Sequence, residues 1–286
     1  MQIISELERY RRGILHRALV VDYRHLQRWY WEFRTADLHR TAVATQAEED
    51  LIHAIIERYA IESVLDVGCG TGRWAMELAT QFPSANVIGV DIAPPPVSEQ
   101  AAPGFSADNY TFVQGNVLER LPFADRSFDF VHQRYLIMGI PANRWPGVVA
   151  ELMRVTRPGG WIELIETEPP YGAPALNQLA DWGKLLVSKR GIDFAVASQI
   201  GPLLTAAGAA DVTARPLTIP VGKPGGRLGA MMVVDYLSAL TAVRGPLTKA
   251  GIASEAAYDA ALAQARLELD QRSLPQNVYV AYGRKP

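Results

Sequence analysis

The chain has 286 residues, of which 49% are hydrophobic and 20% charged, and its formal net charge is −2. The apolar content is ample for a large core, and the balanced charge argues against a nucleic-acid-binding protein, which usually carries a basic patch or a high pI. The single cysteine excludes an intrachain disulfide, and no segment approaches the ~18 uninterrupted apolar residues of a membrane span. We therefore expect a cytoplasmic protein that binds neither nucleic acid nor membrane.

Residues 1–60 carry apolar side chains at helical spacing, which predicts helices. Between the two apolar stripes lies the densest aromatic cluster of the chain, residues 28–34. Ordinary core packing is expected to account for part of this cluster.

From residue 61 the pattern changes to alternating strands and helices, which is typical of a parallel sheet with crossover helices. We expect strands at 63–67, 86–91, 110–114, 127–132 and 160–166, and helices near 72–82, 143–156 and 174–190. Pro94 to Pro96 end the regular structure after the second strand, because consecutive prolines lack N–H donors. The segment Arg157-Pro158-Gly159-Gly160 predicts a tight connection into the fifth strand.

The last 75 or so residues continue the same plan, by the same reading of apolar patterns. A strand over 212–221, broken at Pro216, and a terminal strand over 276–282 flank two helical stretches within 223–274. Ser254, followed by Glu255, predicts the N-cap of the second stretch.

The most informative segment runs from Val64 to Gly72, where a buried apolar strand leads into a turn with glycine at every second position. Such glycines let a ligand approach the backbone closely, and the N–H groups of the following helix point at that ligand. A dinucleotide-binding turn needs a further glycine or alanine where Arg73 stands, and a phosphate-binding loop needs a Gly-Lys-Ser/Thr ending, which is absent. A tight turn without a ligand is the remaining alternative.

This turn, with Asp66 two places ahead of its first glycine, resembles the first motif of the class I S-adenosylmethionine-dependent methyltransferases. Further matches follow in the order and spacing of that family, in the segments 86–91, 114–123, 121–131 and 157–163. Within the superfamily, Trp74 and the segments 83–85, 87–91 and 158–163 resemble the LaeA-like methyltransferases of secondary metabolism.

The resemblance implies an α/β fold: a Rossmann-like, doubly wound, mostly parallel seven-stranded sheet. The helical patterns described above add an N-terminal lid and a helical insertion before the last strand to this sheet. The corresponding organisation is an N-terminal helical cap at 1–50, a methyltransferase core at 51–222, a helical insertion that caps the substrate at 223–274, and the final core strand at 275–286.

The implied cofactor is S-adenosyl-L-methionine. Asp91 ends the second strand at the distance from the turn where a carboxylate reaches ribose hydroxyls, although it could also cap the next turn. Asn116 stands where the family commonly has an aspartate that accepts from the adenine amino group, and its amide oxygen can accept the same bond. The full set of expected cofactor contacts is Asp66, Gly68, Cys69, Gly70, Asp91, Ile92, Asn116, Val117 and Gln133.

A general base is needed only if the acceptor must lose a proton. His132, at the end of the fourth expected strand, is the catalytic candidate, with a structural histidine as its alternative; Glu166, Glu168 and His39 follow. Glu166 and Glu168 lack a recognisable third ligand for a metal, so none is expected. The residues expected to contact the acceptor are Tyr23, Tyr30, Trp31, Arg134 and Glu166.

These observations predict methyl transfer to a small, largely apolar acceptor by in-line displacement, in a site closed by the N-terminal helices and residues 223–274. Two alternatives stay open: a protein or nucleic-acid methyltransferase, and a non-catalytic regulator that binds the cofactor. A homo-oligomer is compatible with the sequence.

Overall fold

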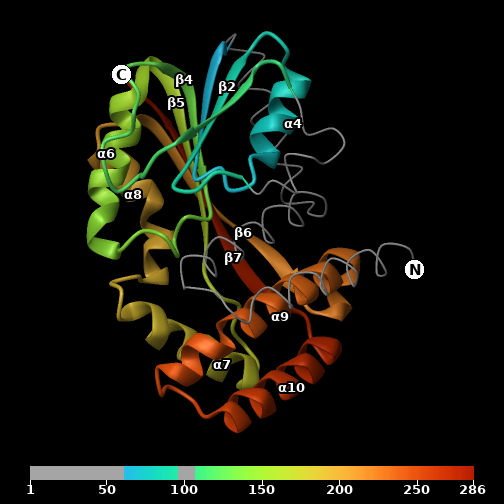
Figure 1. The fold of residues 1–286 in the computed structure, drawn as a ribbon. Coiled ribbons are helices and arrows are strands. Elements are labelled where there is room, and N and C mark those ends of the chain that lie inside the picture. Colours follow the sequence, from blue (N-terminus) through green and yellow to red (C-terminus); the bar gives the residue numbers. More distant parts are fainter. Residues whose placement is uncertain (1–60, 96–106) are drawn as a thin grey trace.

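The computed structural model describes residues 61–95 and 107–286, which form a seven-stranded sheet with helices on both faces and at one end (Figure 1). The strand order is β3-β2-β1-β4-β5-β7-β6. Strand β7 is antiparallel to both of its neighbours, and the other pairs are parallel. The strands are β1 (Ser63–Val67), β2 (Asn86–Asp91), β3 (Tyr110–Gln114), β4 (Phe128–Arg134), β5 (Thr156–Thr167), β6 (Ala210–Val221) and β7 (Leu274–Arg284). The expected mostly parallel, doubly wound sheet is confirmed.

The strand order reverses between β1 and β4, because the chain runs outward from β1 through β2 to β3 and then returns to β4. Strands β1 and β4 are buried on both faces. Val64 of β1 and Phe130 of β4 pack in one apolar cluster, and Leu65 and Val131 pack in the other. In open α/β sheets, ligands bind in the crevice outside the carboxyl ends of the strands at this reversal. The fold therefore directs attention to the segments that follow β1 and β4.

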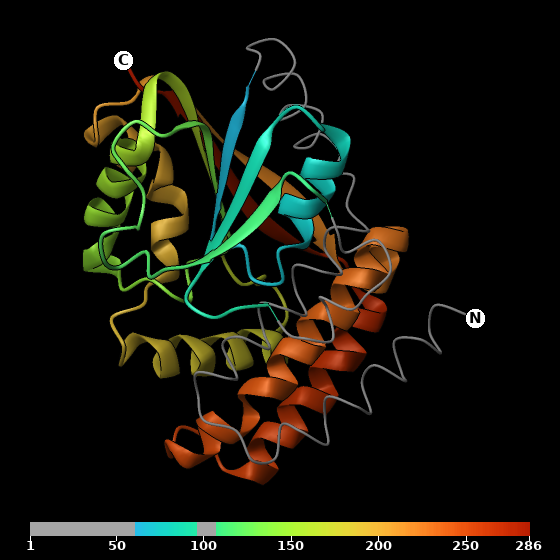
Figure 2. The same cartoon turned by 45° about the horizontal axis from the view of Figure 1, so that its top comes forward.

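Of the described α-helices, three cover the faces of the sheet and three pack beyond one of its ends. One face of the sheet is covered by α6 and α8 and the other by α4, whereas α7, α9 and α10 pack together beyond one end of the sheet (Figures 1 and 2). Their bounds are α4 (Arg73–Gln81), α6 (Trp145–Val155), α7 (Pro174–Ser188), α8 (Ile200–Ala206), α9 (Gly226–Lys249) and α10 (Glu255–Gln271), with short 3₁₀ turns η1 (Ala142–Arg144), η2 (Phe194–Gln199) and η3 (Lys223–Gly225).

The two helices expected within 223–274 are α9 and α10. The Ser254 hydroxyl accepts from the backbone N–H of Ala257 at 3.2 Å and so caps α10 as expected. By length and composition, α9 could span a membrane, but its residues Met232, Tyr236 and Leu240 pack in the core formed with α7, α10 and the ends of β5 to β7. In this fold one side of α9 is part of the core.

Two sequence expectations are wrong in detail. The expected tight connection at residues 157–160 belongs to β5, which begins at Thr156 and contains a register shift opposite Phe128. Gly159, at φ 80°, keeps this segment in the sheet by donating its N–H to the Lys285 carbonyl at 2.7 Å. Pro216 does not break its strand, since β6 is an edge strand, where a missing N–H leaves no ladder partner unpaired.

Candidate functional site

The turn after β1 has the backbone conformation that its glycines predict. Gly68, Gly70 and Gly72 lie at φ 73°, 56° and 78°, in the left-handed region that side chains disfavour. The N–H groups of Gly68 and Cys69 both donate to the Val90 carbonyl, at 2.8 and 3.1 Å. The turn is thereby fixed against the end of β2 before it enters α4.

Close packing on two sides gives the turn a second reason to be glycine-rich. A Cβ at Gly68 would lie 2.5 to 2.7 Å from the side-chain carbons of Leu136, which follows β4. A Cβ at Gly72 would collide with the Tyr110 hydroxyl. The two glycines therefore admit neighbours that any larger residue would displace.

Asp91 connects the end of β2 to this turn. Its Oδ2 accepts from the Gly70 N–H at 2.9 Å, and its Oδ1 accepts from the Ala93 N–H at 3.3 Å. The carboxylate also lines the cavity described next. The backbone contacts hold the carboxylate in place at the carboxyl edge of the sheet.

These elements border a cavity of about 550 Å³, which we call the glycine-turn cavity. Its walls are the glycine turn, the end of β2, the segment 115–118, the segment 136–140 after β4, and Arg190. The volume lies within the range of about 300–1,000 Å³ that is usual for small-molecule and cofactor sites. Of the residues expected to contact a cofactor, six line this cavity: Gly68, Gly70, Asp91, Ile92, Asn116 and Val117.

Asn116 uses its side chain locally. Its Oδ1 accepts from the Leu118 N–H at 3.0 Å, and its Nδ2 donates to Glu119 at 3.1 Å. The amide oxygen is therefore already engaged in a turn, and a bond from adenine would have to use its second lone pair.

Asp66, Cys69 and Gln133 do not line the glycine-turn cavity. Asp66 lies buried within β1, where burial raises its pKa to about 6 against the opposing charges of His132 and Arg134. Cys69 is buried beside Gly89 and Tyr110, and burial raises the pKa of its thiol. None of these three residues therefore borders the cavity in which the other six expected cofactor contacts lie.

His132 does not lie at the end of its strand, because β4 continues to Arg134. The imidazole is buried within the sheet: Nδ1 lies 3.0 Å from Glu163 Oε2, and the ring stacks on Trp74 with centroids 4.0 Å apart. Burial also raises the pKa of the Glu163 carboxyl. His132 lines neither of the cavities described here, and this position favours the structural alternative over a base beside the acceptor.

Glu166 holds the backbone that follows β4. Its two carboxylate oxygens accept from the N–H groups of Leu136, at 2.7 Å, and Ile137, at 3.1 Å, and from the Gln133 side chain at 3.1 Å. The carboxylate is fully buried and shapes the wall of the glycine-turn cavity through these bonds. Glu166 itself lines neither cavity, and its expected contact with the acceptor stays a prediction. Arg134, also expected to contact the acceptor, is buried with its guanidinium 5.7 Å from the Tyr135 ring centroid and lines neither cavity.

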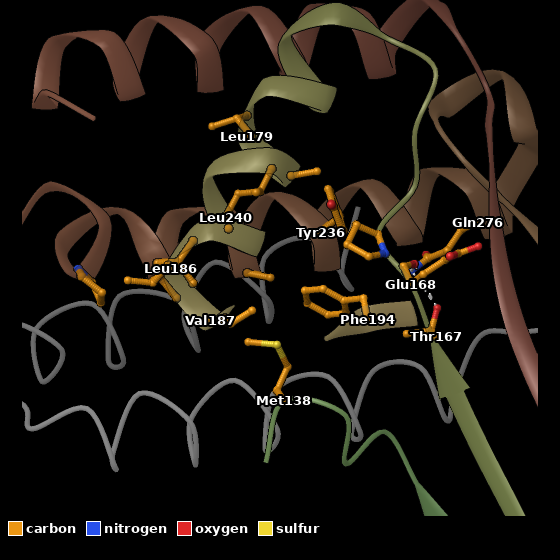
Figure 3. Close-up of a pocket in the computed structure, with 17 residues that line it drawn as sticks. Met138, Thr167, Glu168, Leu179, Leu186, Val187, Phe194, Tyr236, Leu240 and Gln276 are labelled. Carbon is orange, nitrogen blue, oxygen red and sulfur yellow. Dashed lines mark hydrogen bonds between the residues drawn. The ribbon is translucent and has the colours of Figure 1, made fainter. Parts of the chain in front are cut away.

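A second cavity of about 100 Å³ lies between α7, α9 and the ends of β5 and β7, and we call it the helical cavity (Figure 3). Its lining is mostly apolar and includes Leu179, Val187, Phe194 and Leu240. The polar residues Thr167, Glu168 and Gln276 lie together at one side of it (Figure 3). Glu168, a base candidate from the sequence, borders this cavity.

Sequence reasoning missed Gln276, although a signal was present. The residues of β7 alternate, and Gln276 shares the buried row with Leu274, Val278 and Val280. A polar residue in an apolar row is unusual unless it meets a polar partner. That pattern could have directed attention to the start of the last strand.

The two cavities share their walls at two places. Leu136, Gly139 and Ile140 line the glycine-turn cavity, while Met138 lines the helical cavity. At the C-terminal end of α7, Val187 faces the helical cavity and Arg190 the glycine-turn cavity. The two cavities are therefore neighbours.

Other expectations concern residues beyond these walls. Tyr23, Tyr30, Trp31 and His39 lie outside the described residues. Within 61–95 and 107–286, no group of three His, Cys, Asp or Glu side chains is placed to hold a metal ion.

Comparison with known proteins gives a family match over the segment that contains the glycine turn. Residues 64–160 match the family described as methyltransferase domain. Over 101 residues the chain is 38% identical to methyltransferase str3 of Strobilurus tenacellus. This alignment covers 35% of this chain and 34% of that protein. It is 30% identical over 180 residues to the demethylmenaquinone methyltransferase of Geobacillus stearothermophilus, covering 56% of this chain and 76% of the relative. The chain spans about a third of the length of the fungal relatives that it matches.

A solved structure shares the fold. The phosphoethanolamine N-methyltransferase 2 of Haemonchus contortus, in complex with S-adenosyl-L-methionine, superposes with a TM-score of 0.50 at 20% identity. The match covers 83% of this chain and 52% of that one.

Proposed function

Because the chain belongs to the class I S-adenosylmethionine-dependent methyltransferases, we propose that it transfers a methyl group from S-adenosyl-L-methionine to a small, largely apolar acceptor of the natural-product type. The observation that carries this proposal is the pair of adjoining cavities, one beside the glycine turn and one apolar. Transfer between two bound molecules requires two such sites with a common boundary.

The residues of the glycine-turn cavity fit the cofactor. Gly68 and Gly70 line the cavity where the methionine part would lie, and the Asp91 carboxylate at the end of β2 is the acceptor for the ribose hydroxyls. Ile92 and Val117 supply apolar surface for the adenine, beside Asn116. When bound, the cofactor supplies a methyl group already activated by a sulfonium centre.

The chain's own contribution is to hold the two molecules in place and to exclude water. Glu166 fixes the wall between the cavities through the N–H groups of Leu136 and Ile137. The helical cavity would receive the apolar part of the acceptor, with the segment 223–274 as one of its sides and the N-terminal segment as a proposed cover. Neither His132 nor Glu166 is proposed as a base, because neither borders a cavity.

A methyl-transfer experiment with fractionated acceptors tests the proposal. Purified protein is incubated with S-adenosyl-L-methionine labelled in its methyl group and, separately, with small molecules below 1 kDa, proteins or nucleic acids from the source cells. We expect label in the small-molecule fraction, and its loss in Asp91→Ala. Label in a macromolecular fraction would instead support a protein or nucleic-acid methyltransferase. Cofactor binding without transfer to any fraction would support a non-catalytic regulator.

A further inference from the structure

The polar side of the helical cavity is formed by the acceptor groups of Glu168 and Gln276. Among the described residues that line the cavity, Glu168 is the one with a charged side chain. Its Oε1 accepts from the Asn277 amide and from the Tyr279 hydroxyl, both at 2.9 Å. These two bonds fix one oxygen of the carboxylate, and both come from neutral groups. The part of the cavity wall that the structure describes contains no cationic side chain to balance the carboxylate.

Gln276 supplies a second acceptor beside it. Its Nε2 donates to the Thr167 hydroxyl at 3.1 Å and to the backbone carbonyl of Glu168 at 3.0 Å. Since a carbonyl can only accept, this second bond establishes which end of the amide is the nitrogen. The amide oxygen of Gln276 takes part in neither of these two bonds.

That oxygen is buried and receives no hydrogen bond from the described residues. The side chain is 1% exposed, so bulk water does not satisfy it. Buried polar atoms without a partner are rare in folded proteins, and each one asks for an explanation. Here the residue lines a cavity, and a ligand in that cavity can supply the missing donor.

We propose that the helical cavity binds a ligand with an amino head and an apolar body. The ammonium group donates to the Glu168 carboxylate and to Gln276 Oε1, and the body lies among the apolar side chains of α7 and α9. An ammonium fits this pair better than a hydroxyl does, because it carries at least two hydrogens for two acceptors and a positive charge for the carboxylate.

This assignment rests on the proposed function in one respect, namely that the ligand is the methyl acceptor. A protonated amine has no lone pair for methyl transfer, so in this binding mode the head anchors the ligand and another atom reacts. The apolar side of the cavity, opposite Glu168 and Gln276 in Figure 3, sets the direction in which the body extends.

Three probes with one body and different heads test the proposal: 4-phenylbutan-1-amine, 4-phenylbutan-1-ol and butylbenzene. Each is titrated at pH 7 into the protein without cofactor, and binding is followed by calorimetry or by NMR. We expect the amine to bind more tightly than the alcohol. Its affinity should exceed that of butylbenzene by about tenfold or more, as for a charged hydrogen bond. An amine that binds no more tightly than butylbenzene overturns the proposal, and so does an alcohol that binds more tightly than the amine.

Variants locate the effect in this cavity. Glu168→Gln should remove most of the preference for the amine over the alcohol, and Gln276→Leu should weaken both relative to butylbenzene. Glu255→Gln is the matched control, because its side chain is exposed and does not line the cavity, and it should keep the order of the probes. Gly183→Leu should block all three probes, since a Cβ at Gly183 meets no atom within 4 Å and the larger side chain enters the cavity.

The outcomes separate this proposal from the function itself. If Glu168→Gln does not fold, as judged by its melting curve, the order of the probes on the unmodified protein and on Gln276→Leu still decides. If the amine and the alcohol bind Gln276→Leu as tightly, relative to butylbenzene, as they bind the unmodified protein, the proposal is contradicted. The expected order in a protein that fails to bind S-adenosyl-L-methionine would overturn the proposed function and leave the amine site standing.

Discussion

Gly68→Ala tests whether the glycine turn is shaped by its contact with Leu136. At φ 73° an alanine adopts the left-handed region at a cost of about 1–2 kcal/mol. The new Cβ would also lie 2.5 to 2.7 Å from the Leu136 side chain, which must move, and overpacking of this kind costs about 1–3 kcal/mol. We expect Gly68→Ala to lower the free energy of unfolding by about 2–5 kcal/mol.

A double-mutant cycle separates the two contributions. In a Leu136→Ala background the steric conflict is gone, so Gly68→Ala should then cost only the backbone share of about 1–2 kcal/mol. Urea denaturation of the four proteins measures both costs, provided that the slopes agree. Equal costs in the two backgrounds would refute the contact as the reason for glycine at this position, and no cost in either would refute the conformational argument as well.

Three further predictions concern buried carboxylates and the N-terminal segment. Burial raises the pKa of Asp66 from 3.8 to about 6, so its contribution to stability is present below pH 3.8 and is lost as the pH rises to 6. Asp66→Asn should therefore be more stable than the parent at pH 8, by up to about 3 kcal/mol, and no more stable at pH 4; a difference that is the same at both pH values contradicts this. Glu166→Gln places an amide against two backbone donors and should cost at least about 2 kcal/mol in urea denaturation, whereas the exposed Glu62→Gln should cost almost nothing. A chain that starts near Thr45 should still bind S-adenosyl-L-methionine but transfer methyl groups poorly, as should Tyr30→Ala in the full chain; normal turnover in both would exclude a lid.

The parts of the fold that follow from local patterns were predictable from the sequence. The strands at 63–67, 86–91 and 110–114 have the expected bounds, because each is an apolar run between residues that stop a strand. The glycine turn was predictable for the same reason, since its conformation is set by residue types within it.

What the sequence did not predict depends on neighbours far along the chain. Pro216 is tolerated because β6 happens to be an edge strand, and this depends on how β7 pairs. His132 was placed at a strand end because the two further residues of β4 were not foreseen. Glu166 binds backbone about 30 residues away, a role that composition near position 166 does not indicate. Gln276 became a candidate only when β7 was seen beside α9 and the end of β5.

The most direct test of the account is a calorimetric titration of S-adenosyl-L-methionine into the parent protein, Asp91→Ala and Asn116→Ala, each shown to be folded by its melting curve. We predict binding to the parent and a roughly 5- to 150-fold loss in Asp91→Ala, as expected for charged hydrogen bonds to a buried ligand. Asn116→Ala should lose less, because its bonds are neutral and its amide oxygen already accepts from Leu118. No binding to the parent, or a larger loss in Asn116→Ala than in Asp91→Ala, would contradict the account.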